Sequence, residues 1–257
     1  KKTAHPIGQA VAVLYRTNAQ SRSMEEALRR KGIPYRIYGG ISFYARKEVK
    51  DLLAYFRLTV NPADEEALKR VINYPKREIG KTSVDKIIVA ADRENCSLWE
   101  VLERINSIET GLTAATRGRI ADFVAMIKSF SVMLKTKSAF DLASHIAMST
   151  GLLKELYADK SPEGISHYEN LQELLNGIKE FTDKGTTPLP APSGELEADN
   201  TLRTLDVFLQ DIALITDKEN DETNDESVSL MTIHASKGLE FKSVYVVGLE
   251  ENLFPSQ

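Results

Sequence analysis

The segment PKREIGKTS, residues 75–83, differs at one key position from a loop that cradles nucleotide phosphates. That loop has the pattern G-x-x-x-x-G-K-[ST], and this chain has Pro75 in place of the first glycine. A nucleotide loop leaves a strand, but residues 65–74 before it have apolar side chains at helical spacing. Proline also cannot take the positive φ that glycine allows. The nucleotide interpretation therefore fails.

The same segment is suited to binding a different phosphate, as the turn of a helix-hairpin-helix arrangement. A following helix capped by Thr82 or Ser83 would offer turn amides and a helix dipole to an anion. Residues 69–86 include six basic and two acidic side chains, so a duplex backbone phosphate is the natural partner. A helix connection with a solvated charged surface is the alternative. The predicted duplex contacts are Lys76, Arg77, Gly80, Lys81 and Thr82.

A second group of polar residues follows an apolar run near the carboxyl end. In MTIHASKGLEF, residues 231–241, we expect a strand ending at His234, a Lys-Gly turn and then Glu240 in an apolar setting. Ligands bind at the carboxyl ends of strands in open parallel sheets, so these groups are candidates for a site. A single histidine is more often structural than functional; the string as a whole is more specific.

The elements that would position these residues alternate between strand and helix at the start of the chain. An apolar run at 11–16 predicts a strand, and 21–32 a helix ended by glycine. Residues 34–38 predict a second short strand, and 47–60 a helix with one apolar face. This alternation predicts a parallel sheet.

Residues 63–215 have helical periodicity almost throughout and predict an all-helical block. It is interrupted by 186–200, whose Pro, Gly and acidic residues indicate a mobile loop. Six acids and one lysine at 217–226 indicate a solvated linker. Two runs typical of buried strands follow, at 228–234 and 243–249. We therefore expect a sheet domain that carries a long helical insertion.

The composition of the 257 residues fits one large domain or two smaller ones. No apolar run approaches the roughly 18 residues of a membrane span, and no signal-peptide core follows the basic start, so we expect a cytoplasmic chain without membrane contact. The single cysteine, Cys96, excludes an intramolecular disulfide and a zinc site, and is expected to be a buried apolar residue.

The net charge of −4 conceals an asymmetry along the chain. Residues 1–60 have 12 basic and 4 acidic side chains, a net of +8, whereas the remainder has 21 basic and 33 acidic, a net of −12. A basic first segment can attract a polyanion locally even when the whole molecule is acidic.

Taken together, these segments resemble the superfamily 1 DNA helicases of the UvrD, PcrA and Rep type over nearly the whole chain. Residues 228–257 resemble their motif V and the strand beyond it, and 11–62 resemble the segment that enters the second motor domain. Residues 73–87 correspond to the duplex-contacting hairpin of the helical subdomain 2B. Such helicases clamp ATP between two RecA-like domains and move 3′ to 5′ along a single strand.

The resemblance implies an α/β RecA-like parallel sheet, present in part, with a large all-helical insertion. Residues 1–62 would begin motor domain 2A, 63–216 would form insertion 2B, and 217–257 would be the acidic linker and the return to 2A. It assigns Gly238 and Glu240 to the nucleotide. Single-strand contacts would be Arg16, Thr17, Asn18, Thr232 and His234.

The resemblance also implies that catalysis needs groups outside this sequence. The phosphate-loop lysine, the carboxylates for Mg²⁺ and the transition-state arginine do not occur in the 257 residues, so we expect a fragment with no complete catalytic site, no metal ligands and no activity alone. ATP and Mg²⁺ would be cofactors of the full-length protein and not of the fragment. Partners would be DNA, as single strand and junction, the missing amino-terminal motor domain, and repair or replication proteins.

One departure from the resembled family concerns the hairpin. Relatives usually have Gly-Ile-Gly where this chain has Glu78-Ile79-Gly80. A carboxylate near the phosphate site predicts weaker duplex contact, and Glu78→Gly should tighten it. Two other functions stay open: a non-catalytic DNA-binding or protein-recruiting module, and part of a helicase-nuclease.

Overall fold

The computed structural model describes residues 11–184, 189–190, 196–197, 202–216 and 227–249. The chain divides into two compact units, each described here by itself. The sheet unit comprises Lys1–Val49, Lys160–Gly177 and Asp211–Gln257, and the helical unit comprises Lys50–Asp159 and Ile178–Gln210. This division is based on contacts within the chain and does not test the domain limits predicted from the resemblance. Those limits therefore stay predictions.

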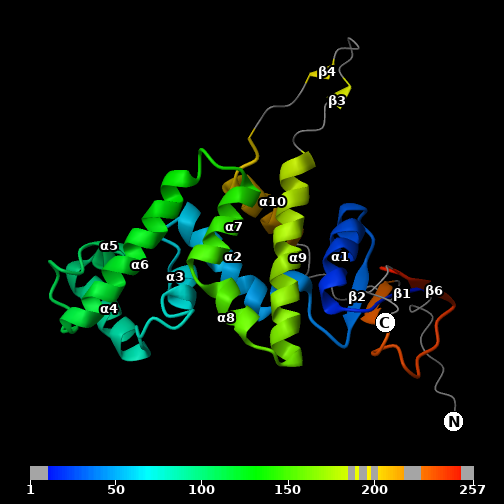
Figure 1. Ribbon diagram of the computed structural model, residues 1–257, viewed down its shortest axis with the longest axis horizontal. Coiled ribbons are helices and arrows are strands. Elements are labelled where there is room, and N and C mark those ends of the chain that lie inside the picture. Colours follow the sequence, from blue (N-terminus) through cyan, green and yellow to red (C-terminus); the bar gives the residue numbers. More distant parts are fainter. Residues whose placement is uncertain (1–10, 185–188, 191–195, 198–201, 217–226, 250–257) are drawn as a thin grey trace. The chain divides into compact units, whose positions relative to one another are not determined.

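The sheet unit is built on four parallel strands in the order β2-β5-β1-β6 (Figure 1). Their bounds are Val11–Tyr15 for β1, Tyr35–Tyr38 for β2, Val228–Thr232 for β5 and Ser243–Val246 for β6. Ala12, Leu14 and Met231 form a buried cluster on the two central strands. The predicted partial α/β parallel sheet is confirmed.

Two details of the predicted strands are wrong. β5 ends at Thr232 and not at His234, because the chain turns there and the Ser236 amide donates to the Thr232 carbonyl at 3.1 Å. β6 was expected to be buried, but all four of its residues are exposed. Within the described residues it lies at the edge of the sheet and pairs with β1 alone.

Helices of the sheet unit follow the strands closely. η1 (Asn18–Gln20) and α1 (Ser21–Arg30) come after β1, and α1 ends as predicted at a glycine with positive φ, Gly32. η2 (Phe43–Ala45) comes after β2 and leads into α2 (Lys47–Val60). The first part of α9 (Pro162–Lys184) and the end of α10 (Leu205–Thr216) complete the unit.

Among the residues that the structure describes, the helical unit contains the remaining parts of α2, α9 and α10 and six further helices. Their bounds are α3 (Glu65–Val71), α4 (Lys81–Glu94), α5 (Leu98–Glu103), α6 (Ala114–Met133), α7 (Ala139–Ser149) and α8 (Leu152–Ala158). Ser97, Thr113 and Ser138 cap α5, α6 and α7 with their side chains, which stabilises each helix start. Apolar side chains from several helices fill the core, among them Leu102, Phe123, Phe130 and Ile146.

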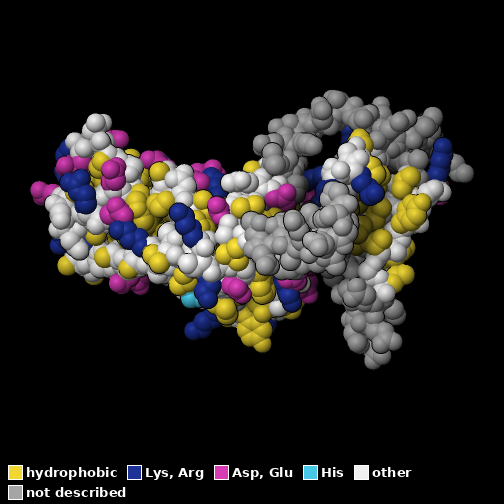
Figure 2. All heavy atoms as spheres, turned by 90° about the horizontal axis from the view of Figure 1, so that it is seen from above, with side chains coloured by type: hydrophobic (Ala, Val, Ile, Leu, Met, Phe, Trp, Pro, Cys, Tyr) yellow, Lys and Arg dark blue, Asp and Glu magenta, His cyan; other side chains and the backbone are white. Residues whose placement is uncertain are grey.

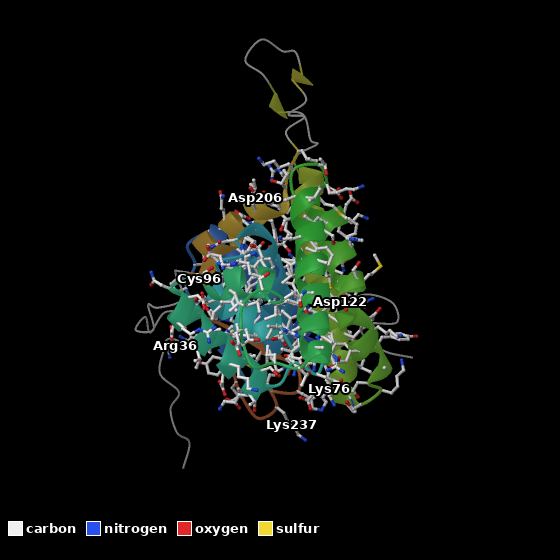
Figure 3. All side chains as sticks on the ribbon, turned by 90° about the vertical axis from the view of Figure 1, so that its left-hand side faces the viewer. Arg36, Lys76, Cys96, Asp122, Asp206 and Lys237 are labelled. Carbon is white, nitrogen blue, oxygen red and sulfur yellow. The ribbon has the colours of Figure 1, made fainter. Side chains whose placement is uncertain are left out.

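The predicted loop at 186–200 contains a short antiparallel pair, β3 (Leu189–Pro190) with β4 (Leu196–Glu197). The rest of that loop and the acidic linker at 217–226 lie outside the described residues. Cys96, labelled in Figure 3, was predicted to be buried but is only half-buried. It follows the left-handed Asn95 at the end of α4. In the described part of the chain, no helix is long and apolar enough to cross a membrane.

Candidate nucleic-acid interface

The carboxyl edge of the sheet brings together the residues predicted to contact a single strand. β1 and β5 are neighbours, with Tyr15 opposite Thr232, so both strands end at the same level. The Ile233 amide donates to the Tyr15 carbonyl at 2.9 Å and continues the pairing one residue further. Arg16 and Asn18 leave β1 exposed, and His234 leaves β5 exposed. Two segments more than 200 residues apart in the sequence therefore present polar groups at one edge.

Backbone hydrogen bonds fix the shape of both segments. The Gln20 side-chain oxygen accepts from the Arg16 and Thr17 amides at 2.9 and 3.0 Å. Thr232 Oγ1 accepts from the Ala235 amide at 3.2 Å, which leaves the hydroxyl proton of Thr232 available as a donor. These hydrogen bonds define the geometry of both turns.

The end of β2 approaches the same place. Gly39 has φ +71°, and a Cβ there would lie 3.1 Å from the Cβ of Ala235. A side chain at this position would be both strained and crowded. Glycine thus lets the segment after β2 pass close to the turn after β5.

A buried polar network in the sheet unit holds the segment after β2, and no sequence pattern predicted it. Glu25 of α1 is fully buried and accepts from the Phe43 amide at 3.1 Å and from Ser42 Oγ at 2.8 Å. Arg46 donates to Asn170 of α9 at 2.8 Å and to Ser21 at 2.8 Å. Each of these polar groups therefore has a partner within the buried network.

Burial shifts the protonation of two groups in this network. Burial raises the pKa of Glu25, while hydrogen bonds from Ser21, Ser42 and the Phe43 amide and the charge of Arg29 act in the opposite direction. Burial, followed by the Glu25 charge, raises the pKa of Tyr15 to about 12. Tyr15 therefore stays a neutral phenol beneath the sheet edge at physiological pH.

The residues assigned to the nucleotide lie beyond the turn after β5. Gly238 has φ +87°, and Glu240 is exposed rather than in the apolar setting predicted for it. Lys237, next to them, extends away from the ribbon in Figure 3. In the described ranges no three His, Cys, Asp or Glu side chains are grouped so as to hold a metal ion.

In the helical unit, residues 73–80 join α3 to α4 as a turn that internal hydrogen bonds stabilise. The Asn73 side-chain oxygen accepts from the Arg77 and Ile79 amides at 2.9 and 3.0 Å. Ile79 is fully buried. The Tyr55 hydroxyl donates to the Tyr74 carbonyl and contacts the Val71 carbonyl at 3.3 Å. The turn is therefore part of the folded helical unit.

The start of α4 differs from the prediction that Thr82 or Ser83 caps it. Gly80 is the N-cap, with extended backbone, and its carbonyl accepts from the Ser83 amide at 2.9 Å. Lys81 and Thr82 thus lie in the first turn, and their own amides have no acceptor within the helix. Both residues are exposed, as are Gly80 and Lys76. These four predicted duplex contacts are therefore accessible.

Arg77 has a different environment from the other predicted duplex contacts. Its guanidinium lies 5.7 and 5.5 Å from the ring centroids of Tyr55 and Phe123. It also donates, at 3.1 to 3.3 Å, to the carbonyl oxygens of Val71, Pro75 and Thr150. Because these groups belong to the helical unit itself, the guanidinium fastens the turn to α7 and α2. Its predicted phosphate contact stays untested.

In the sequence, Glu78 lies between Arg77, which contacts the helical unit, and the exposed residues Gly80, Lys81 and Thr82. It has φ +56°, a left-handed conformation that is unusual for a residue with a side chain. Its exposed carboxylate pairs with Arg119 of α6 at 2.5 Å. On the face shown in Figure 2, Lys and Arg side chains of the helical unit alternate with Asp and Glu and do not form one patch. Contacts with phosphate on that face would therefore be local.

The family model for the UvrD-like helicase C-terminal domain matches residues 3–257. This chain belongs to that family. The match covers both the strand ends and the hairpin, so the resemblance predicted from the sequence is confirmed.

Individual relatives of this UvrD-like domain agree with the match. The ATP-dependent DNA helicase PcrA of Bacillus subtilis (strain 168) is 39% identical over 251 residues, which are 95% of this chain and 32% of that protein. PcrA of Leuconostoc citreum is 36% identical and covers 99% of this chain. DNA helicase II of Salmonella typhimurium (strain LT2) is 34% identical and covers 96%. The chain spans about a third of the length of the curated relatives it matches.

Proposed function

We propose that this UvrD-like domain is the DNA-holding part of an ATP-dependent 3′ to 5′ DNA helicase. The observation that carries the proposal is the common carboxyl edge of β1 and β5, where Arg16 to Asn18 and Thr232 to His234 meet. Relatives named as ATP-dependent DNA helicases support the activity of the longer protein. The sheet edge would hold the single strand, and the hairpin would hold the duplex.

The chemistry of the sheet edge suits a backbone that must be held without reading sequence. Hydroxyl, amide and imidazole groups donate to phosphate oxygens and carry no base preference. Thr232 keeps its hydroxyl proton for such a contact because its oxygen already accepts from Ala235. Arg16 adds one exposed positive charge. Weak, sequence-independent contacts would allow the DNA strand to advance after each cycle of ATP hydrolysis.

The nucleotide role of Gly238 and Glu240 extends the proposal to ATP. Both residues are exposed beside the turn after β5, so they can form one wall of a cleft. ATP would supply the free energy for movement when it is bound with its metal ion. In this proposal Gly238 and Glu240 would bind and orient the nucleotide.

The single-strand contact is tested with the 257-residue chain and a labelled oligonucleotide, by fluorescence anisotropy across a salt titration. Arg16→Ala should lower the log–log salt slope by about 0.7, the value for one phosphate of a single strand. Lys31→Ala is the matched control, because Lys31 is an exposed cation in the turn before β2, away from the carboxyl edge. Equal slopes for the two variants would refute the single-strand site.

The enzymatic part is tested in the longer reading frame. DNA-stimulated ATP hydrolysis would support the helicase. Its absence in a folded protein would favour a non-catalytic DNA-binding or docking module, and a nuclease domain in that frame would favour a helicase-nuclease.

A further inference from the structure

We propose that Arg119 is an additional ligand for duplex backbone phosphate, and that Glu78 occupies it in the DNA-free protein. The inference rests on the proposed duplex role of the hairpin. Nothing in the sequence of α6 suggested it, because Arg119 lies more than 35 residues beyond the hairpin. The fold brings its guanidinium to the turn.

The first argument is geometric. A guanidinium nitrogen of Arg119 lies 2.5 Å from the Glu78 carboxylate. Glu78 stands in the turn between exposed Lys76 and exposed Lys81. A guanidinium that contacts the residue between these lysines is a candidate ligand for the same phosphate, because its planar fork matches two phosphate oxygens.

The second argument is energetic. The Arg119 and Glu78 side chains are 41% and 61% exposed, and such surface ion pairs contribute about 0–1 kcal/mol. An approaching phosphate therefore displaces the carboxylate at little cost. The carboxylate stays tethered nearby, however, and competes with the phosphate for the same cation. Glu78 thus limits duplex affinity by occupying a phosphate ligand as well as by repelling the phosphate.

These two effects of Glu78 make different predictions, which a double-mutant cycle separates. If Glu78 only repels phosphate, Glu78→Gln raises affinity at least as much when Arg119 is alanine. If Glu78 also occupies Arg119, the gain is larger when Arg119 is present than when it is alanine. Glutamine is the informative replacement because it removes the charge at the left-handed position, whereas Glu78→Gly also relieves the backbone.

The experiment measures binding of the 257-residue chain to a tailed duplex by anisotropy from about 50 to about 200 mM salt. Glu78→Gln should raise affinity about three- to sixfold at the lowest salt, as expected for one unit charge 4–6 Å from a phosphate in water. In that background, Arg119→Ala should return affinity to near the parent value and lower the salt slope by about 0.9.

A second exposed ion pair, between α5 and α6, supplies the control. Glu103 of α5 pairs with Lys128 of α6 at 2.8 Å, and Lys128 lies nine residues from Arg119, about 14 Å along the helix. Glu103→Gln makes the same change in net charge, and the rise along α6 from Arg119 to Lys128 exceeds the Debye length of about 10 Å at 0.1 M salt. It should raise affinity less than twofold, and Lys128→Ala in that background should leave the slope unchanged.

The possible results separate this inference from the proposed function. An unchanged slope for Arg119→Ala, or an equal gain from Glu78→Gln with and without Arg119, overturns the assignment of Arg119. Lys81→Ala should lower the slope by about 1 if the hairpin binds duplex at all. If the salt slope falls with Lys81→Ala but not with Arg119→Ala, this inference alone is overturned. If the slope falls with neither variant, the duplex role itself is overturned.

Discussion

Replacing Arg77 by lysine is expected to destabilise the helical unit although the charge is retained. The guanidinium donates to three carbonyl oxygens at 3.1 to 3.3 Å and lies over two aromatic rings. An ammonium group on a flexible stem cannot reach three carbonyls that a planar fork reaches together. A phosphate ligand on the surface, in contrast, would tolerate lysine with little change in stability.

The magnitude follows from the contacts that are lost. A hydrogen bond from a charged donor contributes about 1.5–3 kcal/mol, and a cation–π contact about 0.5–1 kcal/mol. Tyr55 still contacts the Val71 carbonyl in the variant, so two carbonyls lose a partner. Lysine can restore one of them. We expect Arg77→Lys to lower the free energy of unfolding by about 2 kcal/mol and Arg77→Ala by about 4 kcal/mol.

Urea denaturation followed by tryptophan fluorescence measures this loss. The single tryptophan, Trp99 in α5, is buried in the helical unit and reports on it locally, which matters in a chain of two units. Lys76→Arg, at an exposed neighbouring position, is the control and should stay within about 0.5 kcal/mol of the parent. Parent-like stability of Arg77→Lys, together with a reduced duplex salt slope for Arg77→Ala, would refute the structural role and favour the phosphate contact.

Two further predictions concern the sheet unit. Gly177→Ala in α9 should cost about 1–3 kcal/mol, because the new Cβ would lie 2.6 Å from a guanidinium nitrogen of buried Arg22. Gly118→Ala in α6 is the control, because a Cβ there would meet nothing within 4 Å. It should be neutral or stabilising by up to about 1 kcal/mol. Similar shifts of the thermal midpoint for the two variants would contradict the predicted clash at Gly177. The second prediction concerns the stability of the parent protein relative to the Glu25→Gln variant, which should fall as pH rises above 4.5. Burial raises the pKa of Glu25, so the folded state binds more protons than the unfolded state in this range. A difference in urea midpoint that is constant or rises between about pH 4 and about pH 8 would show that this carboxyl does not control the dependence.

The sheet and most helices could be predicted because their signals are local. The apolar run at 11–16 corresponds to β1, and the periodic segment 47–60 has the same bounds as α2. The seven-residue α8 falls within the block 63–215 that the sequence predicts to be helical. The resemblance assigned residues after β1 and after β5 to one single strand, and these two strands are parallel neighbours in the sheet.

The environment of the polar residues was harder to predict because their partners are distant in the sequence. Arg77 contacts the carbonyl of Thr150, and Arg22 pairs with Glu173 at 2.8 Å. Helical spacing identifies which side chains share a face but not whether that face meets a polar neighbour. Arg22, at 2% exposure, would be assigned to solvent by any rule based on residue type.

The hairpin divides two tasks among adjacent residues. Asn73, Arg77 and Ile79 point inward and hold the turn, while Lys76 and Lys81 stay exposed. Fixing the backbone of each residue costs about 1–2 kcal/mol, and the folded turn has already met that cost. If the hairpin binds duplex as proposed, a basic residue that only holds the turn adds no phosphate contact of its own. The measured salt slope should then be smaller than the count of positive charges in this segment.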